Sequence, residues 1–210
     1  MQLAAHELYD LHDLTASCAN SITSMGHFLQ QAQEPALRSL IEQHLPFHVA
    51  DYNKKVSLLQ QNGMQIPFSA SPLRATLADP TALPVPPAPA VTPRTDAQLL
   101  DDREICLSYL LTLKRAGREY AWAAMEMANA EIRTFLEQAF MLSSHQAYDV
   151  WQYMVQHGWY PVHPADQAGQ ELIAGAYNPV PATGGLRQGA TGAPGAGMGE
   201  PVMGTGQTLM

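Results

Sequence analysis

The chain has 210 residues, 46% of them hydrophobic, so it is long enough to bury a sizeable core in one domain or two small ones. Its 11 Lys and Arg against 19 Asp and Glu give a formal net charge of −8, and no cluster of five or six basic residues is present to neutralise phosphates. This charge balance argues against nucleic acid as a partner.

The N-terminal residues MQLAAHELYD lack a basic segment followed by an apolar run, and no stretch approaches the roughly 18 apolar residues that a membrane span needs. We therefore expect no transmembrane segment and synthesis in a cytoplasm. Cys18 and Cys106 are too few for a disulfide scaffold and have no C-x-x-C spacing. We expect both cysteines to be small buried apolar residues.

The first predicted helix covers residues 3–32. Its apolar seam, the line of residues that faces other helices, steps by 3 and 4 in alternation. The seam consists of Leu8, Leu11, Thr15, Cys18, Ile22, Met25 and Leu29. This spacing is typical of a helix packed in a bundle.

A second helix is predicted at residues 35–62, starting with Pro35 in a first turn that tolerates proline and capped by Gly63 in the left-handed conformation. Its predicted seam is Ile41, Leu45, Val49, Tyr52, Val56 and Leu59. Pro46 lies inside this helix and removes a backbone donor, so we expect it to kink the helix or split it in two.

Residues 65–96 contain eight of the 16 prolines, which predicts an extended connection. An extended chain rises about 3.1 Å per residue and a helix about 1.5 Å, so this segment can run the whole length of a bundle. We expect a long crossover between two pairs of helices.

Two further helices are predicted at residues 97–128 and 130–157. The third seam is Cys106, Leu110, Leu113, Gly117, Tyr120 and Ala124, and the fourth is Leu136, Phe140, Ser144, Ala147, Trp151 and Met154. Asn129 is a favourable N-cap for the fourth helix, and Gly158 is predicted to end it in the left-handed conformation.

Residues 163–210 form a low-complexity tail rich in Gly, Pro and Met, which we expect to be largely disordered. This composition leaves open a role in which the tail recruits a partner, as in an adaptor protein. Deletion of residues 175–210 would then leave the helices intact and abolish that binding.

The chain repeats one phrase: LRSLIEQ at residues 37–43 returns as IRTFLEQ at 132–138, and the same offset aligns the seams of the preceding helices. We interpret this as two copies of one helical hairpin. The predicted organisation is a first hairpin at 1–64, a crossover at 65–96, and a second hairpin at 97–162 that completes one bundle. The predicted fold class is therefore all-α, a ferritin-like four-helix bundle built from two helical hairpins joined by a long Pro-rich crossover.

A ferritin-like bundle raises the hypothesis of a di-metal centre, which requires Glu-x-x-His on two helices. No such motif occurs, and mid-helix seam positions hold Thr15, Cys18 and two leucines, so we expect an interior filled by hydrocarbon and no cofactor. The alternative, a ferritin-like metal-binding protein or oxidase, would use His44, His48 and Asp51, which share one helix face. A hydrogen-bonded histidine at the edge of the seam is the preferred interpretation.

No phosphate-binding loop, nucleophile elbow or paired-acid cleft is present, so we expect no enzymatic activity. Aromatic residues gather instead at the fourth helix: Tyr148, Trp151, Tyr153, Trp159 and Tyr160. Most of these are expected to pack in the core and at the helix end. Those left on the surface would suit a contact with another protein.

Two stretches of the second hairpin, DREICLSYLLTLKRAGREYAWAAMEMANAEIRTFLEQAF and SSHQAYDVWQYMVQHGWYPV, resemble the coat F family of bacterial spore coat proteins. The likeness is carried by Asp102-Arg103-x-Ile105, Lys114, Tyr120-Ala121, Glu126-x-Ala128, Arg133, His145, Tyr153-Met154 and Gly158-Trp159-Tyr160. The first hairpin is similar to the more divergent leading half of such proteins. The Gly/Pro/Met tail departs from the family pattern.

The resemblance implies a ferritin-like bundle that is a structural component of the endospore coat. It implies synthesis in the mother-cell cytoplasm, localisation in the spore coat, and other coat proteins or further copies of the chain as partners. The family supplies no catalytic residue to carry over. A bundle with no reactive cleft agrees with such a structural role.

Overall fold

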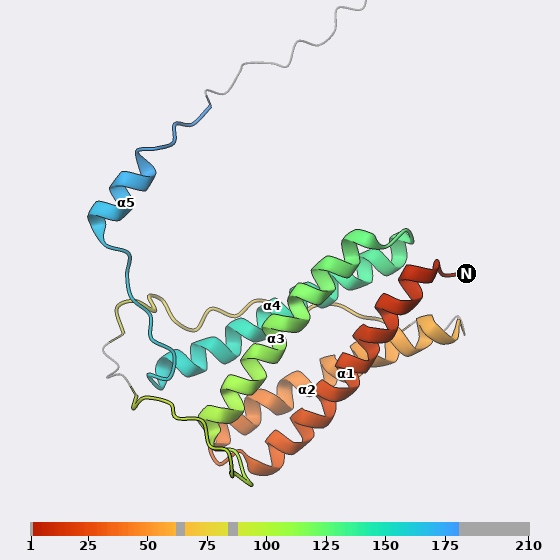
Figure 1. The fold of residues 1–210 in the computed structure, drawn as a ribbon, viewed down its shortest axis with the longest axis horizontal. Coiled ribbons are helices and arrows are strands. Elements are labelled where there is room, and N and C mark those ends of the chain that lie inside the picture. Colours follow the sequence, from red (N-terminus) through yellow and green to blue (C-terminus); the bar gives the residue numbers. More distant parts are fainter. Residues whose placement is uncertain (1, 62–65, 84–87, 181–210) are drawn as a thin grey trace, which may run out of the picture. The chain divides into compact units, whose positions relative to one another are not determined.

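The computed structural model describes residues 2–61, 66–83 and 88–180, and within these residues the regular secondary structure is entirely helical (Figure 1). The helices are α1 (Ala5–Gln31), α2 (Pro35–Gln60), α3 (Asp102–Glu126), α4 (Ala130–Gln156) and α5 (Gln167–Ala174). The predicted all-α class is confirmed. The helices α1, α2 and α4 begin and end within two residues of their predicted limits, whereas α3 begins five residues later than predicted, at Asp102. None of the described helices is long and apolar enough to cross a membrane.

The chain divides into two compact units, residues 1–164 and 165–210. In the first unit α1 packs on α2 and α3 packs on α4, while α1 also contacts α3 and α2 contacts α4 (Figure 1). These contacts make a helical bundle. Whether the arrangement is ferritin-like in detail stays a prediction.

The predicted helix ends at Asn129 and Gly158 are confirmed. The side chain of Asn129 accepts a hydrogen bond from the N–H of Ile132, and Gly158 has a φ of 68°, the left-handed conformation that glycine adopts without strain. At the end of α2 this conformation belongs to Gln61, with a φ of 52°, and the predicted cap at Gly63 lies outside the described residues.

Pro46 does not split α2, because the helix runs without a break from Pro35 to Gln60, and the alternative of a kink stays a prediction. Proline at this position removes the hydrogen bond to the carbonyl of Glu42, one turn earlier. Glu42 and Pro46 are both exposed, so water can bind the freed carbonyl. The lost bond therefore costs too little to end the helix.

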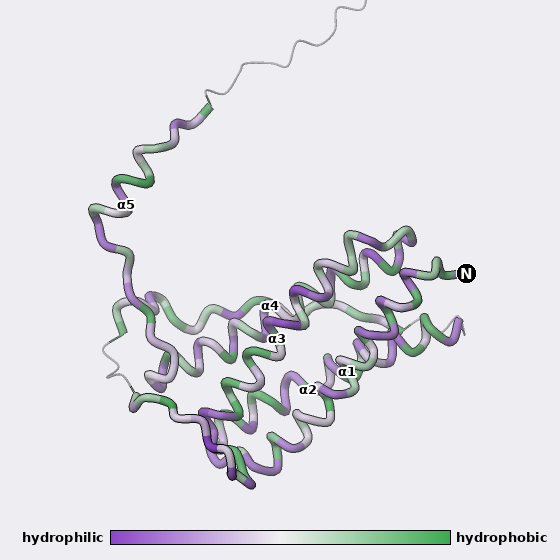
Figure 2. The backbone as a smooth tube through the Cα atoms, viewed as in Figure 1, coloured by the Kyte–Doolittle hydropathy of each residue, from purple (hydrophilic) through white to green (hydrophobic). Residues whose placement is uncertain are grey.

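The seam predicted for α3 is buried at every position from Cys106 to Ala124, and Cys18 and Cys106 are both buried free thiols, as expected. Apolar residues collect in two clusters, one around Ile41 and Leu110 and one around Leu11 and Leu136. Hydrophobic and hydrophilic residues alternate along the four long helices, as expected for helices with one face turned inward (Figure 2).

After Ile41, the residues predicted to face the interior of the bundle from α2 are not the residues that are buried there. Val49 is 39% exposed, and the four other predicted residues are only half-buried: Leu45, Tyr52, Val56 and Leu59. The buried positions of this part of the helix are instead polar or charged: His44, His48, Asp51, Lys54, Lys55 and Ser57. The expectation of a hydrocarbon interior is therefore also wrong, because polar groups occupy the centre of the bundle.

Smaller departures occur on the other helices. In α1, Leu8 is 44% exposed, and in α4 Phe140 is 42% exposed and Ser144 is also exposed, although all three were predicted to face inward. The inward positions next to them belong to Glu7 and Ser143. The spacing of the inward residues was predicted correctly, but at these positions the buried residue is the neighbour of the predicted one.

The crossover is attached along α4 by side-chain hydrogen bonds. The buried carboxamide of Gln152 accepts from the N–H groups of Thr76 and Leu77 and donates to the carbonyl of Arg74. His145 Nδ1 lies within hydrogen-bonding distance of the carbonyl oxygen of Ser71. An irregular segment is thus fixed to a helix by a few polar groups.

In the second unit, α5 is an eight-residue helix whose N-cap, Asp166, accepts a hydrogen bond from the N–H of Gly169. None of its residues is buried. No helix was predicted in this part of the sequence. This helix lies within residues 163–210, the tail that was predicted to be largely disordered, and residues 181–210 of that tail lie outside the described part of the chain.

Candidate functional site

A buried polar cluster joins all four helices of the bundle. Its members are Cys18 from α1, His44, His48, Asp51 and Lys55 from α2, Tyr109 and Tyr120 from α3, and Asp149 from α4. His44, His48 and Asp51 share one face of α2, as their 4 and 3 spacing predicted, and the structure shows that this face is the inward one. The structure adds the partners from the other helices.

At one end of this cluster, the hydroxyl of Tyr109 lies between two imidazoles, 3.0 Å from His44 Nδ1 and 3.3 Å from His48 Nε2. His44 Nε2 lies 3.2 Å from Asp149 Oδ2. A phenol has one proton, so it donates to one histidine and accepts from the other. The four groups therefore form a continuous hydrogen-bonded chain from Asp149 to His48.

At the other end, three donors converge on Asp51 Oδ2: Lys55 Nζ at 2.5 Å, the Tyr120 hydroxyl at 2.6 Å and Cys18 Sγ at 3.3 Å. Lys55 Nζ also donates to the Tyr120 hydroxyl at 2.9 Å and lies 4.8 Å from the centre of that ring. Lys55 is fully buried, and Asp51 is 2% exposed. This is a buried ion pair in which all three donors reach Asp51 Oδ2, whereas Asp51 Oδ1 is buried with no hydrogen-bond partner among the described residues.

Burial fixes the protonation of the surrounding groups. Removal from water raises the pKa of the Cys18 thiol to about 12 and lowers the pKa of His48 to about 4. The pKa values of Tyr109 and Tyr120 are raised well above 10, again mainly by burial. At neutral pH these groups are a thiol, a neutral imidazole and two phenols, so Cys18 is not an activated nucleophile.

The shifted pKa of His48 predicts a loss of stability in mild acid. The unfolded chain takes up a proton near pH 6.5 and the folded protein only near pH 4, so stability present above pH 6.5 is lost as the pH falls towards 4. Between these two pH values the free energy of unfolding falls by up to about 1.4 kcal/mol for each pH unit. Urea unfolding over this range measures it.

A His48→Gln variant should lose this part of the slope, because glutamine does not titrate. His12→Gln is the matched control, since His12 is exposed on α1. If His48→Gln kept the full slope of the unmodified protein, the assignment to His48 would be wrong.

The metal site considered for His44, His48 and Asp51 does not fit this geometry. Among the described residues, no group of three or more His, Cys, Asp or Glu side chains is arranged to hold a metal ion. Both imidazoles are turned towards Tyr109, and Asp51 already binds the ammonium group of Lys55. A ferritin-type di-metal centre is therefore not favoured.

The cluster also has no room for a substrate. The cavity beside it has a volume of about 10 Å³, the space of one water molecule, and is bordered by Cys18, His48, Asp51 and Ser143 among others. Titratable groups in a cleft are candidates for catalysis, but these groups are enclosed. Their arrangement supports a role in holding the four helices together.

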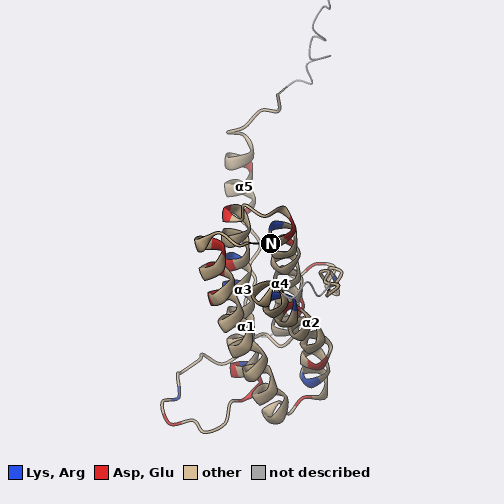
Figure 3. Cartoon of the chain, turned by 90° about the vertical axis from the view of Figure 1, so that its right-hand side faces the viewer, with Lys and Arg blue, Asp and Glu red and all other residues tan. Residues whose placement is uncertain are grey.

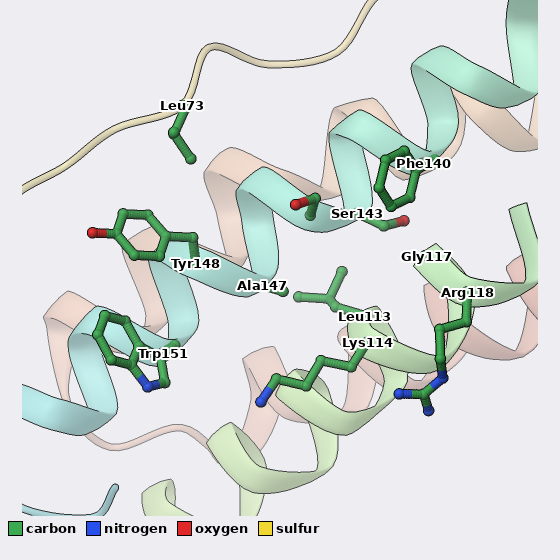
Figure 4. Close-up of a pocket in the computed structure, with 11 residues that line it drawn as sticks. Leu73, Leu113, Lys114, Gly117, Arg118, Phe140, Ser143, Ala147, Tyr148 and Trp151 are labelled. Atoms are coloured by element: carbon green, nitrogen blue, oxygen red, sulfur yellow. The ribbon is translucent and has the colours of Figure 1, made fainter. Parts of the chain in front are cut away.

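An open groove of about 520 Å³, here called the α3–α4 groove, lies between these helices and the crossover (Figure 4). Tyr148 and Trp151, two of the predicted interaction candidates, line it with stacked rings whose centroids are 5.4 Å apart. Trp159 and Tyr160 are half-buried at the end of α4. Tyr153 belongs to the core, where its hydroxyl donates to Glu34.

Trp122, for which no role was predicted, is 69% exposed on α3. It borders a second hollow of about 610 Å³ between α1 and α3, lined also by Asp10, Asp13, Arg115 and Glu119. Lys and Arg are dispersed among Asp and Glu along the helices (Figure 3). The signal in the sequence was the position of Trp122 between the seam residues Tyr120 and Ala124, which puts a large aromatic ring on the outer face.

Comparison with known proteins gives a consistent assignment. Residues 101–163 match the family model described as the Coat F domain, a range that contains the whole of α3 and α4. The chain is 20% identical over 188 residues to the spore coat protein F-like protein YhcQ of Bacillus subtilis (strain 168), covering 87% of this chain and 86% of that relative.

Two crystal structures share the helical fold. A candidate spore coat protein from Bacillus halodurans C-125 has a TM-score of 0.58 at 14% identity, covering 80% of this chain and 97% of that one. A conserved hypothetical protein from Mycobacterium tuberculosis has a TM-score of 0.52 at 13% identity, covering 72% and 99%. The domain match and the curated relative confirm the resemblance to the coat F family that the sequence predicted, and the two crystal structures show that the helical fold is shared.

Proposed function

We propose that this protein is a structural component of the bacterial endospore coat that acts through protein–protein assembly and has no catalytic activity. The match of the entire α3–α4 hairpin to the Coat F domain carries this proposal. It is made in the mother-cell cytoplasm and then joins other coat proteins, or further copies of itself, in the coat.

The interior of the bundle supports a structural role. The buried polar cluster is enclosed, its cavity has the size of one water molecule, and its thiol is protonated at neutral pH. Such a network fixes the positions of four helices relative to one another because each hydrogen bond requires a particular geometry. A stiff bundle is a suitable building unit for a protein layer.

The exposed aromatic side chains are the contacts we propose for assembly. Trp122 has 69% of its surface exposed, and Tyr148, Trp151, Trp159 and Tyr160 are each partly accessible. Trp and Tyr contribute large apolar contact areas at low conformational cost and are enriched among residues that dominate binding energy. Trp122 is the strongest candidate because the bundle itself makes little use of its ring.

Fractionation of purified spores tests the proposed function. We expect the protein in the coat extract, and a Trp122→Ser variant should be reduced there several-fold while its helical content and stability remain those of the unmodified protein. Met141→Ser, which changes an exposed apolar residue of α4, is the control and should be retained. Recovery of the unmodified protein only from the cytosol of vegetative cells would contradict the proposal.

A further inference from the structure

The α3–α4 groove has the shape of a small-molecule site. Its volume of about 520 Å³ falls within the 300–1,000 Å³ typical of ligand pockets. Its apolar lining comes from three segments: α3, α4 and the crossover (Figure 4). These side chains are Leu113 from α3, Phe140, Ala147, Tyr148 and Trp151 from α4, and Leu73 from the crossover. Because Leu73 borders a third side, the groove is more enclosed than a groove formed by two helices alone.

A glycine on α3 helps to keep this space open. Gly117 is buried at the floor of the groove, where an added Cβ would lie 3.5 Å from the Cβ of Ser143 and 3.8 Å from the ring of Phe140. Those are ordinary contact distances, so one extra carbon fits. A leucine at this position would extend further and occupy the groove.

One edge of the groove is cationic. Lys114 and Arg118 line it from positions one turn apart on α3, where two like charges repel each other. None of the described residues that line the groove is Asp or Glu. Lys114 Nζ contacts the neutral side chain of Tyr160, at 3.4 Å from its hydroxyl and 5.0 Å from the centre of its ring. Arg118 also borders the neighbouring hollow that contains Asp10 and Asp13.

We propose that the α3–α4 groove binds a small amphiphilic carboxylate. Its hydrocarbon or aromatic body lies against Phe140, Tyr148 and Trp151, and its carboxylate lies between Lys114 and Arg118. An anion there relieves the repulsion between the two cations and gains charge-assisted hydrogen bonds. The apolar body removes exposed aromatic surface from water. The site shares Tyr148 and Trp151 with the proposed assembly contacts but does not include Trp122, so a loss of dodecanoate binding and a loss of assembly through Trp122 can be distinguished.

Isothermal titration calorimetry of the full chain with dodecanoate, below the concentration at which it forms micelles, tests the site. We expect one dodecanoate per chain. Gly117→Leu should weaken binding at least about tenfold by filling the groove. The double variant Lys114→Gln and Arg118→Gln should also weaken dodecanoate binding by about tenfold, while leaving the binding of neutral dodecan-1-ol unchanged.

Arg115→Gln is the matched control, because Arg115 lies on α3 beside the other hollow and should leave dodecanoate binding unchanged. The double glutamine variant changes groove-edge side chains outside the apolar floor, so it remains informative if Gly117→Leu fails to fold. Absence of dodecanoate binding to the folded protein would overturn the proposal. Unchanged binding in the folded double variant would overturn it as well.

Discussion

Replacing Lys55 by methionine should lower the free energy of unfolding by about 3–5 kcal/mol, because Asp51 would keep a buried carboxylate without its cation. Methionine retains most of the length of lysine, so the expected loss comes from the charge more than from packing. The Tyr120 hydroxyl and the Cys18 thiol still donate to Asp51, but neither carries a positive charge. Urea unfolding followed by circular dichroism measures the difference.

A double variant, Asp51→Leu with Lys55→Met, should recover much of this loss, since an apolar pair of similar volume often replaces a buried ion pair without penalty. The matched control is Arg115→Met, which breaks the ion pair with Glu119 on the surface of α3, where both side chains are at least 40% exposed. That change should cost less than about 1 kcal/mol. A loss below about 1 kcal/mol for Lys55→Met would show that the buried pair contributes little.

Truncation of Leu110 to alanine should lower the free energy of unfolding by about 2–5 kcal/mol. Leu110 has no exposed surface and belongs to the apolar cluster that joins both hairpins. The change removes buried carbons and leaves a cavity that a close-packed interior fills only in part. Thermal or urea unfolding at neutral pH gives the value.

Leu111 provides the matched control, because it is the next residue of the same helix and is 55% exposed. Leu111→Ala should change stability by less than about 0.5 kcal/mol. Equal losses at the two positions would mean that α3 presents a different face to the bundle from the one described.

The long helices could be predicted because their signals are local. Heptad-like spacing identified the inward face of α3 correctly at every position, and Asn129 and Gly158 marked the ends of α4 through backbone chemistry that depends only on neighbouring residues. The coat F resemblance also came from residues within this hairpin, and the family comparison confirmed it.

The inward face of α2 could not be predicted in the same way. Hydrophobic periodicity assigns a polar residue to the surface, and that rule fails when partners distant in the sequence satisfy the polar group. His44 and Lys55 are each paired with tyrosines 65 positions away on α3. The spacing of His44, His48 and Asp51 showed that they share a face, but not that the face is buried.

The site residues were predicted only in part for the same reason. No local pattern in the sequence sets Tyr109 and Tyr120 apart from other core tyrosines. Their hydroxyl groups form hydrogen bonds to His48 and Asp51 only because α2 packs opposite α3. Trp122 was not predicted because the spacing of apolar residues identifies the buried face of a helix and gives no information about single residues on its exposed face. The α3–α4 groove depends on Leu73 of the crossover, whose position no local pattern indicates.

A protease cut in the crossover should leave the two hairpins of the bundle associated with each other. Residues 66–83 are largely accessible and have no helix of their own, so a protease could cut the chain there. The two fragments would still be joined by the hydrogen bonds of Tyr109 and Tyr120 on α3 to side chains of α2, and by the apolar clusters that both hairpins share. A nicked chain should therefore migrate as one folded particle and separate only in denaturant.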